Sequence, residues 1–96
     1  MTSVDDVVRE IVAAAARSLA LKRAIVFGSR ARADARPGSD IDLAFEHDSS
    51  DAEWAAFVNE MADAAPTLLP LDLVDLSRVD PILRSRILSE GRPVHG

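Results

Sequence analysis

Two aspartates separated by one residue, Asp40 and Asp42, follow the pair Gly28–Ser29 after ten intervening residues. On a strand, side chains at this i and i+2 spacing point to the same face. Two carboxylates on one face suit a hard divalent cation such as Mg²⁺, which also takes phosphate oxygens as ligands. A strand that ends in Gly-Ser can present backbone N–H groups to a phosphate. The pattern predicts a triphosphate with divalent metal beside it.

A third carboxylate is expected from a neighbouring strand. Asp72 is the favoured residue, because it lies early in the run Leu71–Leu76, between two leucines. Asp75 competes for this role, although it faces the opposite way on the same strand, and it is more simply a partner of the turn that follows. Three carboxylates can hold two metal ions about 4 Å apart, next to the attacking and leaving oxygens of a displacement.

The phosphate-binding residues are expected at the glycine–serine corner. Gly28 allows the backbone to approach a phosphate closely, and Ser29 can offer both its N–H and its hydroxyl. Arg30 follows directly and is included in the predicted nucleotide site. As a group, Arg30, Arg32 and Arg36 are more simply a solvated helix face than individual ligands.

The hydrophobic pattern predicts the elements that must position these residues. They are a helix over 4–20, a strand over 24–27, a short helix over 29–35, a strand over 40–46, a helix over 51–65, a strand over 68–76, a helix from 81 to the glycine at 91, and an extended tail over 92–96. The order α-β-α-β-α-β-α predicts an α/β (α+β) fold, a small mixed β-sheet with flanking helices. The first two strands should be antiparallel, because their connection is short for a parallel crossover.

Capping patterns fix several helix ends. Thr2 or Ser3 can cap the first helix, the run Ser50–Glu53 is a capping box, and Asp80 caps the last helix. Among the larger side chains, Trp54, Phe57, Val58 and Met61 form an apolar stripe that is expected in the core. His47 and His95 fall in expected loop or tail positions, and both are predicted to lie on the surface.

Composition narrows the class of protein. The chain has 96 residues, which suits one domain over 1–96. Its net charge of −5 argues against a nucleic-acid backbone as the direct partner. It has no cysteine, and Asp5 and Asp6 stand where a signal peptide would carry positive charge. No apolar run is long enough to cross a membrane, so a cytoplasmic protein is expected.

The segment GSRARADARPGSDIDL resembles the signature of the DNA polymerase β-type nucleotidyltransferases, and in particular their smallest members, the minimal nucleotidyltransferase (MNT) domains. The run LDLVDL is similar to the third metal-ligand strand of that family, and PILRSRILSEGRPV resembles its closing helix and tail. The resemblance covers roughly residues 20–95. Ala33 departs from it, since many relatives carry glycine there, but no ligand position is lost.

The resemblance implies a protein adenylyltransferase that acts as an antitoxin. Stand-alone MNT domains of this kind transfer AMP from ATP to a tyrosine of a HEPN ribonuclease toxin, with which they form a hetero-oligomer. It implies that Asp40 and Asp42 bind two Mg²⁺ ions, that Asp72 binds the catalytic ion and accepts the tyrosine proton, and that Gly28 and Ser29 hold the triphosphate. The acceptor is expected on a partner, because 96 residues leave little room for a second substrate-binding domain.

Two other functions remain open at this stage. The chain can be an antitoxin that neutralises its toxin by occlusion, with little catalysis. It can also be a small-molecule nucleotidyltransferase that works with a separate helical subunit.

Overall fold

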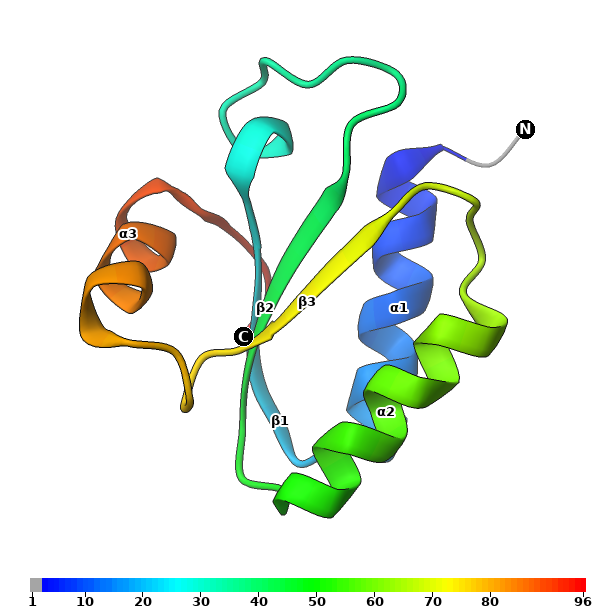
Figure 1. Cartoon of the computed structure of the whole chain (residues 1–96), viewed down its shortest axis with the longest axis vertical. Helices are drawn as coiled ribbons and strands as arrows, with labels where there is room; N and C mark the ends of the chain where they lie inside the picture. Colours follow the sequence, from blue (N-terminus) through cyan, green and yellow to red (C-terminus); the bar gives the residue numbers. More distant parts are fainter. Residues whose placement is uncertain (1–2) are drawn as a thin grey trace.

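A computed structural model describes residues 3–96 of the chain. Its elements are helix α1 (Val4–Ser18), strand β1 (Leu21–Phe27), the 3-10 helix η1 (Gly28–Arg30), strand β2 (Ile41–His47), helix α2 (Asp51–Ala64), strand β3 (Leu71–Asp75), helix α3 (Pro81–Glu90) and strand β4 (Arg92–His95). Figure 1 shows their arrangement. The predicted α/β class with a small mixed sheet is confirmed.

The four strands form one sheet in the order β3-β2-β1-β4. β1 pairs antiparallel with both β2 and β4, whereas β2 and β3 are parallel. The antiparallel first pair agrees with the short connection between β1 and β2. The parallel pair needs a crossover, and α2 supplies it. As a result, the end of β1 and the starts of β2 and β3 lie at the same end of the sheet (Figure 1).

Helices cover both faces of the sheet. α1 and α2 lie on one face and α3 on the other (Figure 1). The larger core cluster lies under α1 and α2, where Ile41, Leu43 and Phe45 of β2 pack with Phe57 and other apolar residues. A smaller cluster lies under α3, where Ala44 of β2 is included. The core-facing residues alternate along β2 with Asp42, which therefore shares the α3 face with Ala44.

The predicted caps form. Ser3 closes a capping box with Asp6, and Ser50 closes one with Glu53. Thr2, the other candidate cap of α1, lies outside the described residues. Asp80 accepts hydrogen bonds from the first turn of α3, which begins with proline. These caps fix where α2 and α3 begin, and hence where the chain enters and leaves β3.

Three element boundaries differ from the prediction by more than two residues. β1 begins at Leu21 rather than at position 24. The expected helix over 29–35 is only the single 3-10 turn η1, because Ala33 has a φ of 62° that a right-handed helix cannot contain. The third strand begins at Leu71 rather than at position 68. Pro70 has no N–H to donate to a sheet, and Leu68 is fully exposed. The tail pairs with β1 as strand β4.

No helix within residues 3–96 is both long enough and apolar enough to pass through a lipid bilayer.

Candidate active site

Asp42 and Asp72 are direct neighbours on the two parallel strands, β2 and β3. Residues in register on adjacent strands point to the same face, so the register brings these two carboxylates together. Asp40 lies two residues before Asp42, in the last part of the loop that leads into β2. The structure therefore gathers the three predicted acidic residues at one end of the sheet.

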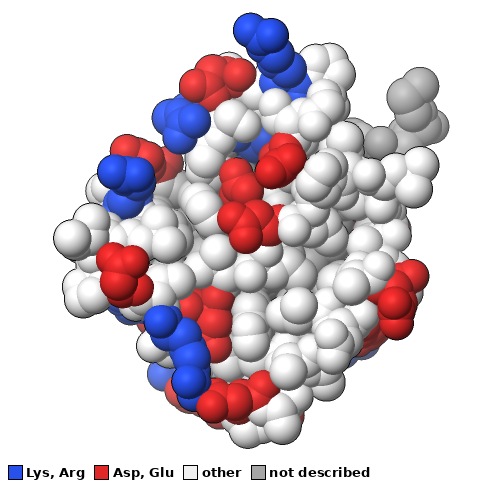
Figure 2. All heavy atoms as spheres, in the orientation of Figure 1, with Lys and Arg blue, Asp and Glu red and all other residues white. Residues whose placement is uncertain are grey.

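The pKa of Asp42 reflects the same grouping of acidic residues. Its pKa is raised above the ordinary aspartate value by burial first, and then by the negative charges of Asp72 and Asp40. The positive charges of Arg32 and Arg30 act in the opposite direction but do not cancel the rise. Figure 2 shows acidic side chains gathered in the upper middle of the face, over the end of the sheet where β2 and β3 begin. A like-charge group of this kind favours a bound cation.

Gly28 forms the corner against which the carboxylate of Asp42 lies. Phe27, the last residue of β1, pairs with Asp42, and Gly28 then turns the chain with a φ of +70°. A Cβ atom at position 28 would overlap Oδ2 of Asp42 and would lie 3.2 Å from its Cγ. Only glycine provides both the backbone conformation and the space. Ser29 follows inside η1.

Arg30 connects the two ends of the loop between β1 and β2. Its Nη2 donates to the carbonyl of Ser39 at 2.7 Å, and its Nε donates to the carbonyl of Asp40 at 3.3 Å. These bonds fix the peptide groups on either side of Asp40. Arg30 was predicted as a nucleotide ligand. Its observed contacts are to the loop that carries Asp40, and the guanidinium still has N–H groups to spare.

The donor set fits a hard divalent cation. The three carboxylates supply oxygen ligands, and the raised pKa of Asp42 shows that their negative charges oppose one another. As the side chains stand, no three His, Cys, Asp or Glu residues within residues 3–96 are close enough together to grip an ion. The register of β2 and β3 nevertheless brings the start of both strands, with these acids, to one end of the sheet. Asp40, Asp42 and Asp72 therefore remain the candidate ligands.

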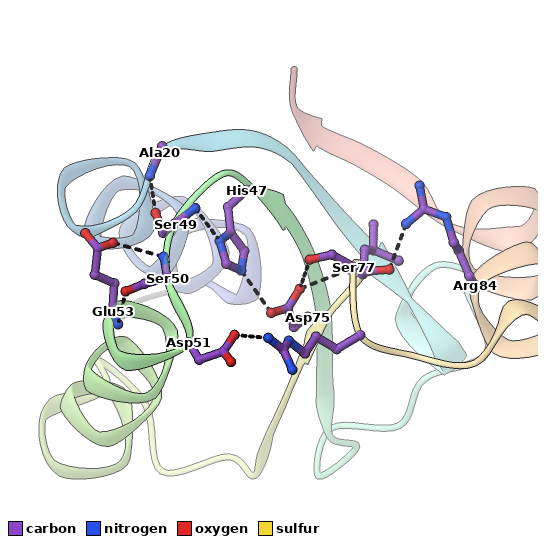
Figure 3. Close-up of polar contacts among 11 residues, drawn as sticks. Ala20, His47, Ser49, Ser50, Asp51, Glu53, Asp75, Ser77 and Arg84 are labelled. Carbon is purple, nitrogen blue, oxygen red and sulfur yellow. Dashed lines mark hydrogen bonds and ion pairs between the residues drawn. The ribbon is translucent and has the colours of Figure 1, made fainter.

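Asp75 lies on the opposite face of β3 from Asp72, and both of its carboxylate oxygens are hydrogen-bonded within the fold. Its Oδ1 accepts hydrogen bonds from the amide of Ser77 at 3.0 Å and from the hydroxyl of Ser77 at 2.5 Å. Its Oδ2 is 3.0 Å from Nε2 of His47 (Figure 3). Burial raises the pKa of Asp75, but the hydrogen bonds from Ser77 and His47 outweigh it, and the pKa lies below the ordinary value. Asp75 thus bonds the turn after β3. This is the structural role that the sequence offered as the alternative to metal binding.

The prediction that His47 lies on the surface is wrong. Its side chain is only 2% exposed, and its ring stacks on Trp54 with centroids 5.3 Å apart. Its Nδ1 accepts a hydrogen bond from the amide of Ser49, so the ring proton is on Nε2. This Nε2–H donates a hydrogen bond to Asp75 (Figure 3). The local sequence predicts a loop at His47, whereas it is the last residue of β2. Its period-two alternation with Phe45, Leu43 and Ile41 was the available signal. His95 is exposed, as predicted.

Comparison with known protein families places this geometry in a defined class. The family described as "Polymerase beta, Nucleotidyltransferase" matches residues 9–96, nearly the whole chain. The chain therefore belongs to the polymerase β-type nucleotidyltransferase family. A comparison with the curated proteins finds none that matches.

Solved structures share the fold over most of the chain. A chain of a toxin–antitoxin complex with AMP-PNP superposes with a TM-score of 0.75 at 22% identity, covering 92% of this chain and 72% of that one. A chain of a complex between tri-AMPylated Shewanella oneidensis HEPN toxin and MNT antitoxin gives a TM-score of 0.68 at 21% identity, covering 92% and 68%. A putative minimal nucleotidyltransferase gives 0.68 at 27% identity, covering 90% and 87%.

Proposed function

We propose that this chain is an adenylyltransferase that transfers AMP from ATP to a tyrosine of a partner protein, a HEPN-type ribonuclease toxin, and so acts as its antitoxin. The observation that carries the proposal is the register pair Asp42–Asp72 beside the Gly28 corner. Membership of the nucleotidyltransferase family supports the reaction class. The proposal treats residues 1–96 as one minimal nucleotidyltransferase domain that works in the cytoplasm.

Each site residue has a role that follows from its position. Asp40, Asp42 and Asp72 would hold Mg²⁺, which supplies charge neutralisation for the triphosphate and the departing pyrophosphate. The backbone of Gly28 and Ser29 faces the β- and γ-phosphates, with the Ser29 hydroxyl as an additional donor. Arg30 fixes Asp40 through the loop carbonyls. Such a site acts mainly by positioning and by electrostatic stabilisation.

The chemical step is a displacement at the α-phosphorus of ATP. The tyrosine oxygen forms a bond to the α-phosphorus while the bond from that phosphorus to the bridging oxygen breaks. Pyrophosphate leaves with the electron pair, and the tyrosine proton passes to the carboxylate of Asp72. The products are O-adenylyl-tyrosine, pyrophosphate and one proton, so the step balances without any further reactant.

The partner follows from the comparisons and from charge. Structures with the same fold include toxin–antitoxin complexes, one of them with a tri-AMPylated HEPN toxin. The net charge of −5 suits contact with a ribonuclease that binds RNA through a basic surface. A stable hetero-oligomer is therefore the expected state of the working protein.

The test is to incubate the chain with the protein encoded next to it, ATP and Mg²⁺, and to measure the mass of that partner. We expect the partner to gain one or more AMP units on tyrosine and to lose ribonuclease activity. Asp42→Asn should abolish the mass increase. Asp63→Asn, at an exposed acid of α2, is the matched control and should leave it unchanged.

Two results would contradict the proposal. Inhibition of the toxin that persists in a double variant, Asp40→Ala with Asp42→Ala, would show neutralisation by occlusion. An unmodified partner combined with AMP transfer to an added aminoglycoside would show a small-molecule transferase that uses a helical partner only for support.

A further inference from the structure

The two edges of the sheet are unlike each other. The β4 edge carries Pro93 and the charged Arg92, and both residue types block the addition of a further strand. The β3 edge has no proline within Leu71–Asp75. In Figure 1, β3 is the foremost strand, and no helix or strand lies in front of it. The β3 edge is therefore the one left open to another chain.

The hydrogen bonds at the ends of β3 show which backbone groups face this open edge. The amide of Ile41 donates to the carbonyl of Pro70 at 2.9 Å, and the amide of Leu76 donates to the carbonyl of Phe45 at 2.9 Å. In a parallel pair, alternate residues turn both of their peptide groups to the same neighbour. Positions 70, 72, 74 and 76 thus bond to β2. Leu71 and Leu73 direct their N–H and C=O groups outward.

The side chains of β3 alternate between two surroundings. Leu71 and Leu73 turn toward α2, where they line a hollow of about 420 Å³ together with Val58 and Met61. Asp72 turns to the other face, in register with Asp42. A strand added to this edge would alternate in the same way. The residue opposite Asp72 would lie on the face of the candidate active site, and its two neighbours would lie over the apolar hollow.

We propose that the acceptor protein presents its tyrosine on an extended segment that pairs with the open edge of β3. The outward peptide groups of Leu71 and Leu73 bond the two residues that flank the tyrosine, and the apolar side chains of these residues fill the hollow beside Val58. The tyrosine stands opposite Asp72. In an antiparallel arrangement this is the close, non-hydrogen-bonded pair position, where Cβ atoms are about 4.5–5.5 Å apart. This inference rests on the proposed function and specifies how its acceptor docks.

Charge distinguishes this occupant from a second copy of the chain. Two β3 edges paired with each other about Asp72 would bring the Asp72 of one copy against that of the other. Like charges directly opposite on paired strands are destabilising, and each copy has a net charge of −5. The edge therefore suits a neutral or basic segment of a different protein.

The test uses the full chain and a synthetic peptide, Lys-Val-Tyr-Val-Lys, as the acceptor. Its control is the same peptide with both valine amides N-methylated, which removes the donors for Leu71 and Leu73 but keeps every side chain. With ATP and Mg²⁺, we expect AMP transfer to the first peptide to exceed transfer to the second by at least about tenfold, since about 1.4 kcal/mol of binding corresponds to a factor of ten. Equal transfer to both peptides would overturn the proposal.

Hydrogen exchange tests the docking without any chemistry. At millimolar peptide, the amides of Leu71 and Leu73 should exchange more slowly, and the N-methylated peptide should have no such effect. Protection at β3 without AMP transfer would reject the proposed reaction but retain the docking edge. Protection confined to β4 or α1, or none anywhere, would overturn the docking edge.

Two variants of the chain complete the test. Val58→Lys places a charge in the hollow, and we expect it to raise KM for the unmodified peptide by at least about tenfold while KM for ATP stays within about twofold. Val94→Lys makes the same change at the β4 edge, and it should alter neither the KM for the peptide nor the KM for ATP. Equal KM values for the peptide in these two variants would show that the hollow beside β3 does not receive the acceptor.

Discussion

Gly28 lies directly against the carboxylate of Asp42, with a backbone φ of +70°. Gly28 begins η1 directly after β1, Asp42 lies on the antiparallel neighbour β2, and Phe27, the last residue of β1, is the register partner of Asp42. Gly28 is proposed to face the phosphates and Asp42 to hold the metal. The two proposed functions therefore depend on residues that pack directly against each other. A side chain added at position 28 must therefore displace the carboxylate of Asp42.

Gly28→Ala is expected to damage both the fold and the reaction. The new Cβ overlaps Oδ2 of Asp42, and the positive φ is unfavourable for alanine. We expect a loss of about 1–3 kcal/mol in the free energy of unfolding, together with loss of AMP transfer. Urea denaturation and the transfer assay measure the two effects. Gly38→Ala is the control, because a Cβ at position 38 has no neighbour within 4 Å. Equal stability of the two variants would contradict the crowding at Gly28.

Asp42→Asn is expected to abolish transfer while stabilising the fold. Because burial and the neighbouring carboxylates raise the pKa of Asp42 in the folded state, the folded protein holds this proton more tightly than the unfolded chain does. Stability therefore falls as the pH rises through that raised pKa, and the penalty is fully present at neutral pH. Removing the charge should increase stability at pH 7 by about 1 kcal/mol, or about 4–8 °C in Tm.

The pH dependence provides the check on Asp42. The gain in Tm of Asp42→Asn over the wild type should shrink as the pH is lowered through the raised pKa, and should vanish well below the ordinary aspartate value, where both states are protonated. A gain that is constant from pH 7 to acid pH would show that charge crowding is not its cause.

Arg30 is expected to act by holding the loop that carries Asp40. A single ammonium group cannot reproduce the two diverging N–H donors that bond the carbonyls of Ser39 and Asp40. Arg30→Lys should therefore resemble Arg30→Ala, with transfer reduced about 10- to 100-fold and faster hydrogen exchange in residues 31–39. Arg17→Ala is the control, since Arg17 is an exposed arginine in the last turn of α1. Full activity in Arg30→Lys would instead indicate a simple charge contact with phosphate.

Asp75→Asn should separate the structural aspartate of β3 from the proposed catalytic one. The asparagine amide has only one oxygen, so it cannot accept from both Ser77 and the Nε2–H of His47. We expect a loss of about 1–3 kcal/mol in the free energy of unfolding, with transfer per folded molecule unchanged. Asp72→Asn should show the reverse behaviour. Loss of transfer in a well-folded Asp75→Asn variant would indicate that Asp75, and not Asp72, is the catalytic residue.

The sequence predicted most of the elements because their signals are local. Capping residues at Ser50 and Asp80 and the alternation along residues 40–46 act within a few positions, and the structure follows them. The shared face of Asp40 and Asp42 is equally local, because it depends only on the period of a strand. The site residues themselves stay predictions, whose roles the variants above test.

The parts that sequence reasoning missed depend on contacts between distant residues. His47 is buried because Asp75, on the next strand, accepts a hydrogen bond from its Nε2–H and because Trp54 of α2 covers its ring. The segment after Gly28 ends its helix at a positive φ of Ala33, and Arg30 instead bonds carbonyls nine and ten residues further on. Neither partner can be read from the local pattern around the residue concerned.

The parallel pairing of β2 and β3 also determines when the proposed site can be assembled during synthesis. Asp72 follows Asp42 by 30 residues (72 − 42), and it reaches its place only after the crossover through α2 has been made. A nascent chain that has just left the ribosome with Gly28 and Asp42 lacks the third acid altogether. An incompletely translated copy would therefore lack the proposed site, which is complete only in molecules that have finished folding.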